Sequence, residues 1–94
     1  MAYLRIVRPQ ISAELYDTIT SNIEVTKNHP LGLIMHAAGE ADGVWHIVEV
    51  WDSEAYADAF DRDVLVPAIE AATGRPPPGD APVVSFDLHQ LVTP

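Results

Sequence analysis

Residues 44–60 read VWHIVEVWDSEAYADAF, and this stretch joins a predicted strand to a predicted helix. Residues 44–51 are rich in β-branched and aromatic side chains, which is typical of a strand. Residues 52–54 then supply a capping side chain and two acidic groups near the positive end of the helix dipole. Helical spacing continues over residues 55–72, although Pro67 lacks an amide proton and predicts a kink or a restart.

Four further segments surround this junction. A β-type run at residues 3–7 ends before a proline, and apolar residues four apart after Ser12, a plausible N-cap, predict a helix to Ile23. A loop at residues 39–43 separates two strand-like runs, residues 31–39 and 44–51. This pattern predicts a hairpin. The proline-rich residues 73–82 predict a connector, and residues 83–92 alternate as a last strand. The element order is β-α-β-β-α-β.

The hairpin register brings two histidines together in this reading. A loop centred near Ala41 sets His36 opposite His46. The same register pairs Met35 with Ile47 and Leu33 with Glu49. Two imidazoles suggest a metal site, but no third ligand stands at a convincing spacing, so surface histidines are favoured. We predict no metal site and no bound cofactor.

Composition excludes several classes of function. The 94 residues suit a single domain, 1–94, and the net charge of −9 with only five scattered basic residues argues against nucleic acid and anionic membrane partners. The absence of cysteine excludes disulfides and thiolate nucleophiles. No apolar run approaches the roughly 20 residues of a membrane span, so a cytoplasmic location is the default.

The element order predicts an α+β, ferredoxin-like antiparallel sheet with two helices on one face. Assigning the more apolar side of each strand to the helices puts nine residues in the core: Leu4, Ile6, Ile34, Val44, Val48, Val50, Val84, Phe86 and Leu88. The opposite side then carries Tyr3, Arg5, Val7, Leu33, Met35, Trp45, Ile47, Glu49, Trp51, Ser85, Asp87 and His89. A second copy of the sheet would cover that mixed face, giving a homodimer that encloses a cavity.

The junction EVWDSEAYADAF at residues 49–60, within this element order, resembles the dimeric α/β barrel superfamily, in its branch of antibiotic-biosynthesis monooxygenases and stress-responsive barrel proteins. Residues 36–60, followed by LVPAI at 65–69 and by His89, look closest to small uncharacterised actinobacterial members. The resemblance implies a homodimeric barrel. Haem-degrading members share a strand-one asparagine and a helix-two histidine, and both are absent here, so haem degradation is disfavoured.

The last predicted strand carries the candidate base. Ser85, Asp87 and His89 alternate and would point the same way, so that Asp87 would favour the protonated ring of His89 and fix its tautomer. A polar strand at the barrel rim is the competing interpretation. Arg5 would either stabilise an anionic substrate or simply pair with Glu49.

Aromatic residues supply the candidate walls of a binding site. By resemblance, Trp51 matches a cavity-lining tryptophan, with core packing as an equal alternative, while Trp45 suits interface packing better. Met35, Glu49 and Tyr3 complete the predicted substrate-binding set.

Two functions remain open on these grounds. One is a cofactor-independent enzyme that oxygenates, cyclises or isomerises a small aromatic or polyketide-like ligand. The other is a non-catalytic ligand-binding or structural homodimer. A void touching His89 favours the enzyme, whereas a barrel packed solid by Trp45, Trp51 and Met35 favours the alternative.

Overall fold

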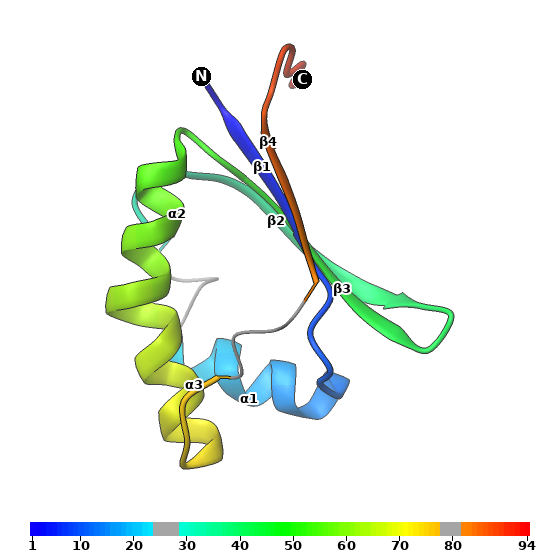
Figure 1. Ribbon diagram of the computed structural model, residues 1–94, viewed down its shortest axis with the longest axis vertical. Coiled ribbons are helices and arrows are strands. Elements are labelled where there is room, and N and C mark those ends of the chain that lie inside the picture. The colour runs from blue at the N-terminus through cyan, green and yellow to red at the C-terminus, as the bar shows by residue number, and fades with distance from the viewer. Residues whose placement is uncertain (24–28, 78–81) are drawn as a thin grey trace.

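The computed structural model describes residues 1–23, 29–77 and 82–94, and it has the predicted β-α-β-β-α-β order (Figure 1). The four strands form one antiparallel sheet in the order β2-β3-β1-β4. The strands are β1 (Tyr3–Val7), β2 (Leu33–Ala41), β3 (Val44–Trp51) and β4 (Val83–Asp87). The helices are α1 (Ala13–Ile23), α2 (Glu54–Phe60), the π-helical turn η1 (Asp61–Leu65) and α3 (Val66–Thr73). Residue 28 of the predicted break after the first helix, and residues 78–81 of the predicted connector, lie outside the described residues.

The helix starts were predicted well. The Ser12 hydroxyl accepts a hydrogen bond from the Leu15 amide at 3.1 Å, as an N-cap does. Ser53 is the N-cap of α2, although its side chain makes no capping hydrogen bond. No helix in the described part of the chain is both long and apolar enough to cross a bilayer.

Pro67 restarts the second helix, as predicted, and a π-helical turn precedes it. The Val66 amide donates to the carbonyl of Asp61, five residues back, and Pro67 falls in the first turn of α3. Proline has no amide proton to donate and its ring crowds the carbonyl four residues before it, so a wider turn ahead of it relieves the conflict. The α2–η1–α3 segment therefore stays one nearly continuous rod (Figure 1).

The β2–β3 turn is tighter than predicted, which makes the predicted register wrong. Asp42 and Gly43 alone form it, with φ of 53° and 78°, the positive values that a two-residue type I′ hairpin requires. His36 consequently lies opposite Glu49 instead of His46. The other observed pairs are Leu33 with Trp51, Met35 with Val50, Ala38 with Ile47 and Gly39 with His46.

A register irregularity between Leu33 and Met35 also reverses the alternation along β2. An extra residue in one strand of a ladder shifts every later side chain to the other face. Leu33 and His36 therefore share a face, and Met35 points to the opposite one. The prediction that Met35 lies beside the tryptophans is wrong for this reason.

The assignment of the two sheet faces was also inverted. The helices cover the face that carries Tyr3, Arg5, Glu49 and Trp51. Trp51 is completely buried, and its ring packs against that of Phe60 in α2 at a centroid distance of 5.3 Å. Large aromatic rings bury more apolar area than valines do, and Arg5 and Glu49 on this face pair with each other, so the aromatic face became the core.

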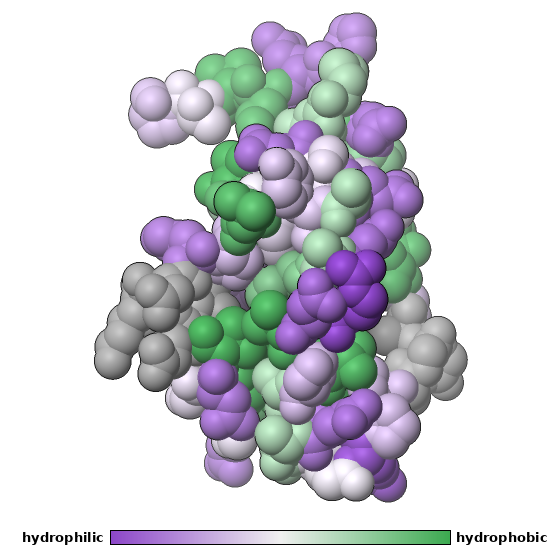
Figure 2. Space-filling view, turned by 90° about the vertical axis from the view of Figure 1, so that its left-hand side faces the viewer, coloured by the Kyte–Doolittle hydropathy of each residue, from purple (hydrophilic) through white to green (hydrophobic). Residues whose placement is uncertain are grey.

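The valine-rich face is therefore the outer one. Its exposed apolar side chains are Met35, Val44, Val84 and Phe86, with fractional exposures of 40–50%. Val50 is the buried exception on this side. The opposite surface, formed by the outside of the α2–η1–α3 rod, mixes hydrophilic and hydrophobic side chains (Figure 2).

Candidate functional site

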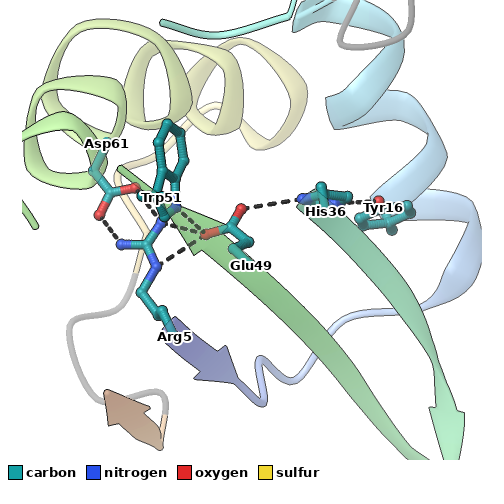
Figure 3. A network of polar contacts seen from close by, with 6 residues as sticks. All are labelled: Arg5, Tyr16, His36, Glu49, Trp51 and Asp61. Carbon is teal, nitrogen blue, oxygen red and sulfur yellow. Dashed lines mark hydrogen bonds and ion pairs between the residues drawn. The ribbon is translucent and has the colours of Figure 1, made fainter. Parts of the chain in front are cut away.

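A charge network lies between the sheet and the helices, centred on Arg5 and Glu49 (Figure 3). The two residues are direct partners in the β1–β3 ladder. Arg5 donates from Nε and Nη2 to Glu49 Oε1, at 3.0 and 2.6 Å. It also donates from Nη1 and Nη2 to the carboxylate of Asp61, the first residue of η1, at 2.5 and 3.0 Å. Arg5 thus ties the sheet to the π-helical turn.

The network keeps both buried charges in their ionised forms. Burial raises the pKa of Glu49, but the His36 hydrogen bond, the Arg5 charge and the hydrogen bonds of Arg5 and Trp51 outweigh it and hold the pKa below its ordinary value. Burial lowers the pKa of Arg5, but the Asp61 hydrogen bond and the Glu49 charge outweigh it and raise the pKa. The guanidinium of Arg5 is therefore paired with two carboxylates, and its charge is not available to bind an anionic substrate.

A three-residue chain of hydrogen bonds leads outward from Glu49. His36 Nδ1 lies 3.1 Å from Glu49 Oε2, and His36 Nε2 lies 2.5 Å from the hydroxyl of Tyr16 in α1 (Figure 3). An ionised carboxylate can only accept, so Nδ1 carries the proton and Nε2 accepts the tyrosine hydroxyl. This is a carboxylate–imidazole–phenol relay. As in the triads that activate nucleophiles, a carboxylate orients an imidazole that in turn contacts a hydroxyl group.

Aromatic rings surround the outer end of this relay. Tyr16 stacks on His36, with ring centroids 6.0 Å apart, and tilts against Trp45 at 5.2 Å. The indole Nε1 of Trp45 is buried and has no hydrogen-bond partner among residues 1–23, 29–77 and 82–94. Burial, followed by the charges of Glu49 and Asp17, raises the pKa of Tyr16, so the phenol keeps its proton in the resting site.

The residues predicted as a catalytic pair lie elsewhere. Asp87 is the last residue of β4 and His89 follows the strand, and both are exposed. Asp87 lies opposite Tyr3 in the β1–β4 ladder, and Ser85 lies opposite Arg5, but both are on the open edge strand. The structure brings together Arg5, Glu49 and Trp51 from the predicted set, and leaves Asp87 and His89 apart from them.

Other candidate sites are weaker. A shallow hollow of about 230 Å³ lies along the β2–β3 hairpin, and the residues that line it are Ala37, Ala38, Gly39, Glu40, Ala41, His46 and Val48. None of the predicted catalytic or substrate-binding residues is among them. Within residues 1–23, 29–77 and 82–94 no three histidine or acidic side chains are placed to hold a metal ion.

Sequence reasoning missed Tyr16, and it paired His36 with His46 instead of Glu49. The dipeptide Asp42-Gly43 is the signal that could have found His36, because Asp-Gly favours a two-residue type I′ turn and that turn moves the pairing of β2 along β3. No comparable signal marks Tyr16. Its contact with the sheet depends on how α1 packs.

Comparison with known proteins supports the fold. No family model and no curated protein matches the sequence. Among solved structures, a protein of Caulobacter crescentus whose name assigns it to the antibiotic biosynthesis monooxygenases is 14% identical, with a TM-score of 0.71 over 95% of this chain and 91% of that one. A conserved protein of Methanosarcina mazei is 16% identical, with a TM-score of 0.68 over 93% and 92%. A haem-degrading protein of Mycobacterium tuberculosis is 15% identical, with a TM-score of 0.61 over 99% and 100%.

At these identities the likeness is one of fold. The shared architecture, with the element order predicted from the sequence, extends over nearly the whole of both chains in each comparison. The chain has a ferredoxin-like α+β fold, which it shares with these proteins.

Proposed function

We propose that this protein is a small-molecule enzyme that transfers protons through Tyr16, His36 and Glu49. The observation that carries the proposal is the unbroken chain of contacts from the Tyr16 hydroxyl through the imidazole to a buried carboxylate. A histidine held in one tautomer by a carboxylate presents its other ring nitrogen as a proton acceptor. Tyr16 is the member of the relay that would touch the substrate.

The relay supports one chemical step that several reactions share. The Tyr16 oxygen accepts an acidic proton from a phenol or enol as His36 Nε2 takes the tyrosine's own proton. Glu49 stabilises the imidazolium that forms, because their contact is short and shielded from water. The substrate anion can then react with dioxygen, close a ring, or take a proton at carbon in place of the oxygen that lost one, which gives cofactor-independent oxygenation, cyclisation or isomerisation.

The site suits an aromatic or polyketide-like substrate. Tyr16 and Trp45 form an angled pair of rings beside the relay, and flat apolar surfaces of this kind bind planar molecules by stacking and area burial. The Tyr16–His36–Glu49 relay replaces Asp87 and His89 as the proposed base, because neither of those side chains makes a hydrogen bond to another described residue that would orient it.

The protein would act as a homodimer. The outer face of the sheet exposes Met35, Val44, Val84 and Phe86 together, and a contiguous apolar face of this kind is normally covered in a soluble protein. A second copy of the same sheet is the simplest cover.

A non-catalytic role has one observation in its favour. Trp51 is fully buried against Phe60 and Arg5 is saturated by two carboxylates, so much of the space predicted to be a cavity is filled. In that case the relay only satisfies buried polar groups and links α1 to the sheet.

Substitution of the relay separates the two functions. We expect a ligand screen, read by tryptophan fluorescence, to yield planar phenols or enols whose turnover falls by about 10²- to 10⁴-fold in Tyr16→Phe and in His36→Gln. His46→Gln is the matched control and should leave turnover unchanged, because the ring of His46 hydrogen-bonds to the carbonyl of Val44 and not to any member of the relay. Turnover that survives both relay substitutions but is lost in His89→Ala would refute the proposal and restore the Asp87–His89 pair.

A further inference from the structure

We infer that Asp61 sets the charge preference of the proposed site, so that it takes uncharged phenols and enols and rejects carboxylates and other anions. This inference rests on the proposed function, since it names the substrate class of the same site. It concerns a residue on the helical rod that contacts neither Tyr16 nor His36, and it acts through Arg5.

The network holds more negative than positive charge. Arg5 is the one cation, and its guanidinium contacts the carboxylates of both Glu49 and Asp61. One positive charge therefore faces two negative charges, and the network keeps one negative charge in excess. Without Asp61, Arg5 and Glu49 would cancel.

The outer end of the relay also lies in a negative environment. Glu49 on the sheet and Asp17 on α1 both act on the Tyr16 hydroxyl, and both are negative. Asp61 acts there only indirectly, by pairing with the Arg5 charge that would otherwise offset Glu49. A neutral proton donor meets no penalty there and can hydrogen-bond to Tyr16. An anion would approach two negative charges, with the positive charge of Arg5 already engaged.

The π-helical turn explains why the balance depends on Asp61 in particular. Asp61 opens η1 and is about one-third exposed, yet it makes two contacts with the buried guanidinium. Asp63, two residues further along the same turn, instead pairs with Arg62 at the surface. The two aspartates therefore form a matched pair, one coupled to the site and one not.

Two probes of nearly equal shape test the inference, namely 2-naphthol, which is neutral at pH 7, and 2-naphthoate, which is an anion. The protein has two tryptophans, so an amide–indole correlation NMR spectrum has two indole signals, and Trp45→Phe identifies the one beside Tyr16. We expect naphthol to shift the Trp45 signal with an affinity at least about tenfold higher than that of naphthoate, the effect of one poorly screened charge within about 10 Å.

The variants then assign the preference to Asp61. Asp61→Asn should reduce the naphthol-to-naphthoate ratio to about twofold or less, whereas Asp63→Asn should leave it at the wild-type value. In the wild type, raising the salt concentration from about 20 mM to about 500 mM should also reduce the ratio, because exclusion by charge is screened and exclusion by shape is not. This second measurement needs no variant to fold.

The outcomes separate the inference from the proposed function. Equal affinity for the two probes, or a ratio that Asp61→Asn leaves at the wild-type value, would overturn the role of Asp61 and leave the proposed function standing, even if salt reduces the ratio. If neither probe shifts the Trp45 signal of the wild type, the substrate does not bind beside Tyr16 and Trp45, and both the proposed function and the role of Asp61 are refuted.

Discussion

Glu49 shows how one buried carboxylate can organise a site. Its Oε1 accepts from Arg5 and from the Trp51 indole, at 3.2 Å in the latter case, while Oε2 faces His36. An acceptor with this many donors needs no further solvation, which is why a charged group is tolerated under the helices.

The same contacts predict how stability depends on pH. The folded-state pKa of Glu49 is below its ordinary value, so the unfolded chain binds the proton first as pH falls. Stability from this group is full above about pH 4.3 and is lost as the pH drops through the folded-state pKa. Urea unfolding at neutral pH and at about pH 3 should show a larger loss for the wild type than for Glu49→Gln. An equal loss in the two proteins would show that other carboxylates dominate.

Trp51 is a core residue, and that has a measurable consequence. Its side chain is fully buried against Phe60, so Trp51→Ala should reduce the free energy of unfolding by about 3–5 kcal/mol. His89→Ala, at an exposed site, should change it by less than about 0.5 kcal/mol. Chemical denaturation followed by circular dichroism measures both. A small loss for Trp51→Ala would mean that the ring is not packed as described.

At the scale of elements, the β2–β3 turn determines which residues face each other across the hairpin. Asp42 has a φ of 53° and tolerates this better than most residues with a Cβ do. Asp42→Ala should destabilise the protein by about 1 kcal/mol, while Asp42→Asn should leave it unchanged or slightly more stable. Thermal unfolding midpoints give the comparison, and equal midpoints for the two variants would contradict the type I′ assignment.

The loop before β2 depends on a glycine for a different reason. Gly32 has a φ of +83°, and an added Cβ would lie 2.3 Å from Cγ of Tyr56 in α2. Gly43 has a similar φ of +78° but open space around it. Gly32→Ala should therefore cost more than Gly43→Ala, which carries only the backbone strain of about 1–2 kcal/mol. Denaturant midpoints of the two variants would rank them, and the reverse order would mean that Tyr56 moves aside freely.

At the scale of the whole molecule, the exposed apolar side chains of the outer sheet face predict a partner that covers them. Phe86 is half-exposed on that face, in the edge strand β4 and beside Leu4 of β1. Phe86→Glu should convert the proposed dimer to a monomer in analytical ultracentrifugation. Val64→Glu, on the exposed helical side, is the control and should leave the dimer intact. A wild type that sediments as a monomer at micromolar concentration would remove the dimer from the proposal.

The order and type of the elements were readable from the sequence because their causes are local. Strand alternation, helical spacing, the Ser12 cap and Pro67 each act within a few residues. The site was readable only in part. Arg5, Glu49 and Trp51 were identified on one face, whereas Tyr16 and Asp61, each from a helix, were not.

Tertiary structure alone decided which sheet face the helices cover. One irregularity in β2 moved His36 onto the face of Glu49, and the contacts that neutralise Arg5 join residues 44 and 56 positions apart in the chain. Local patterns carry no information about such pairings, because the cost of burying a charge depends on partners that only the folded chain brings within reach.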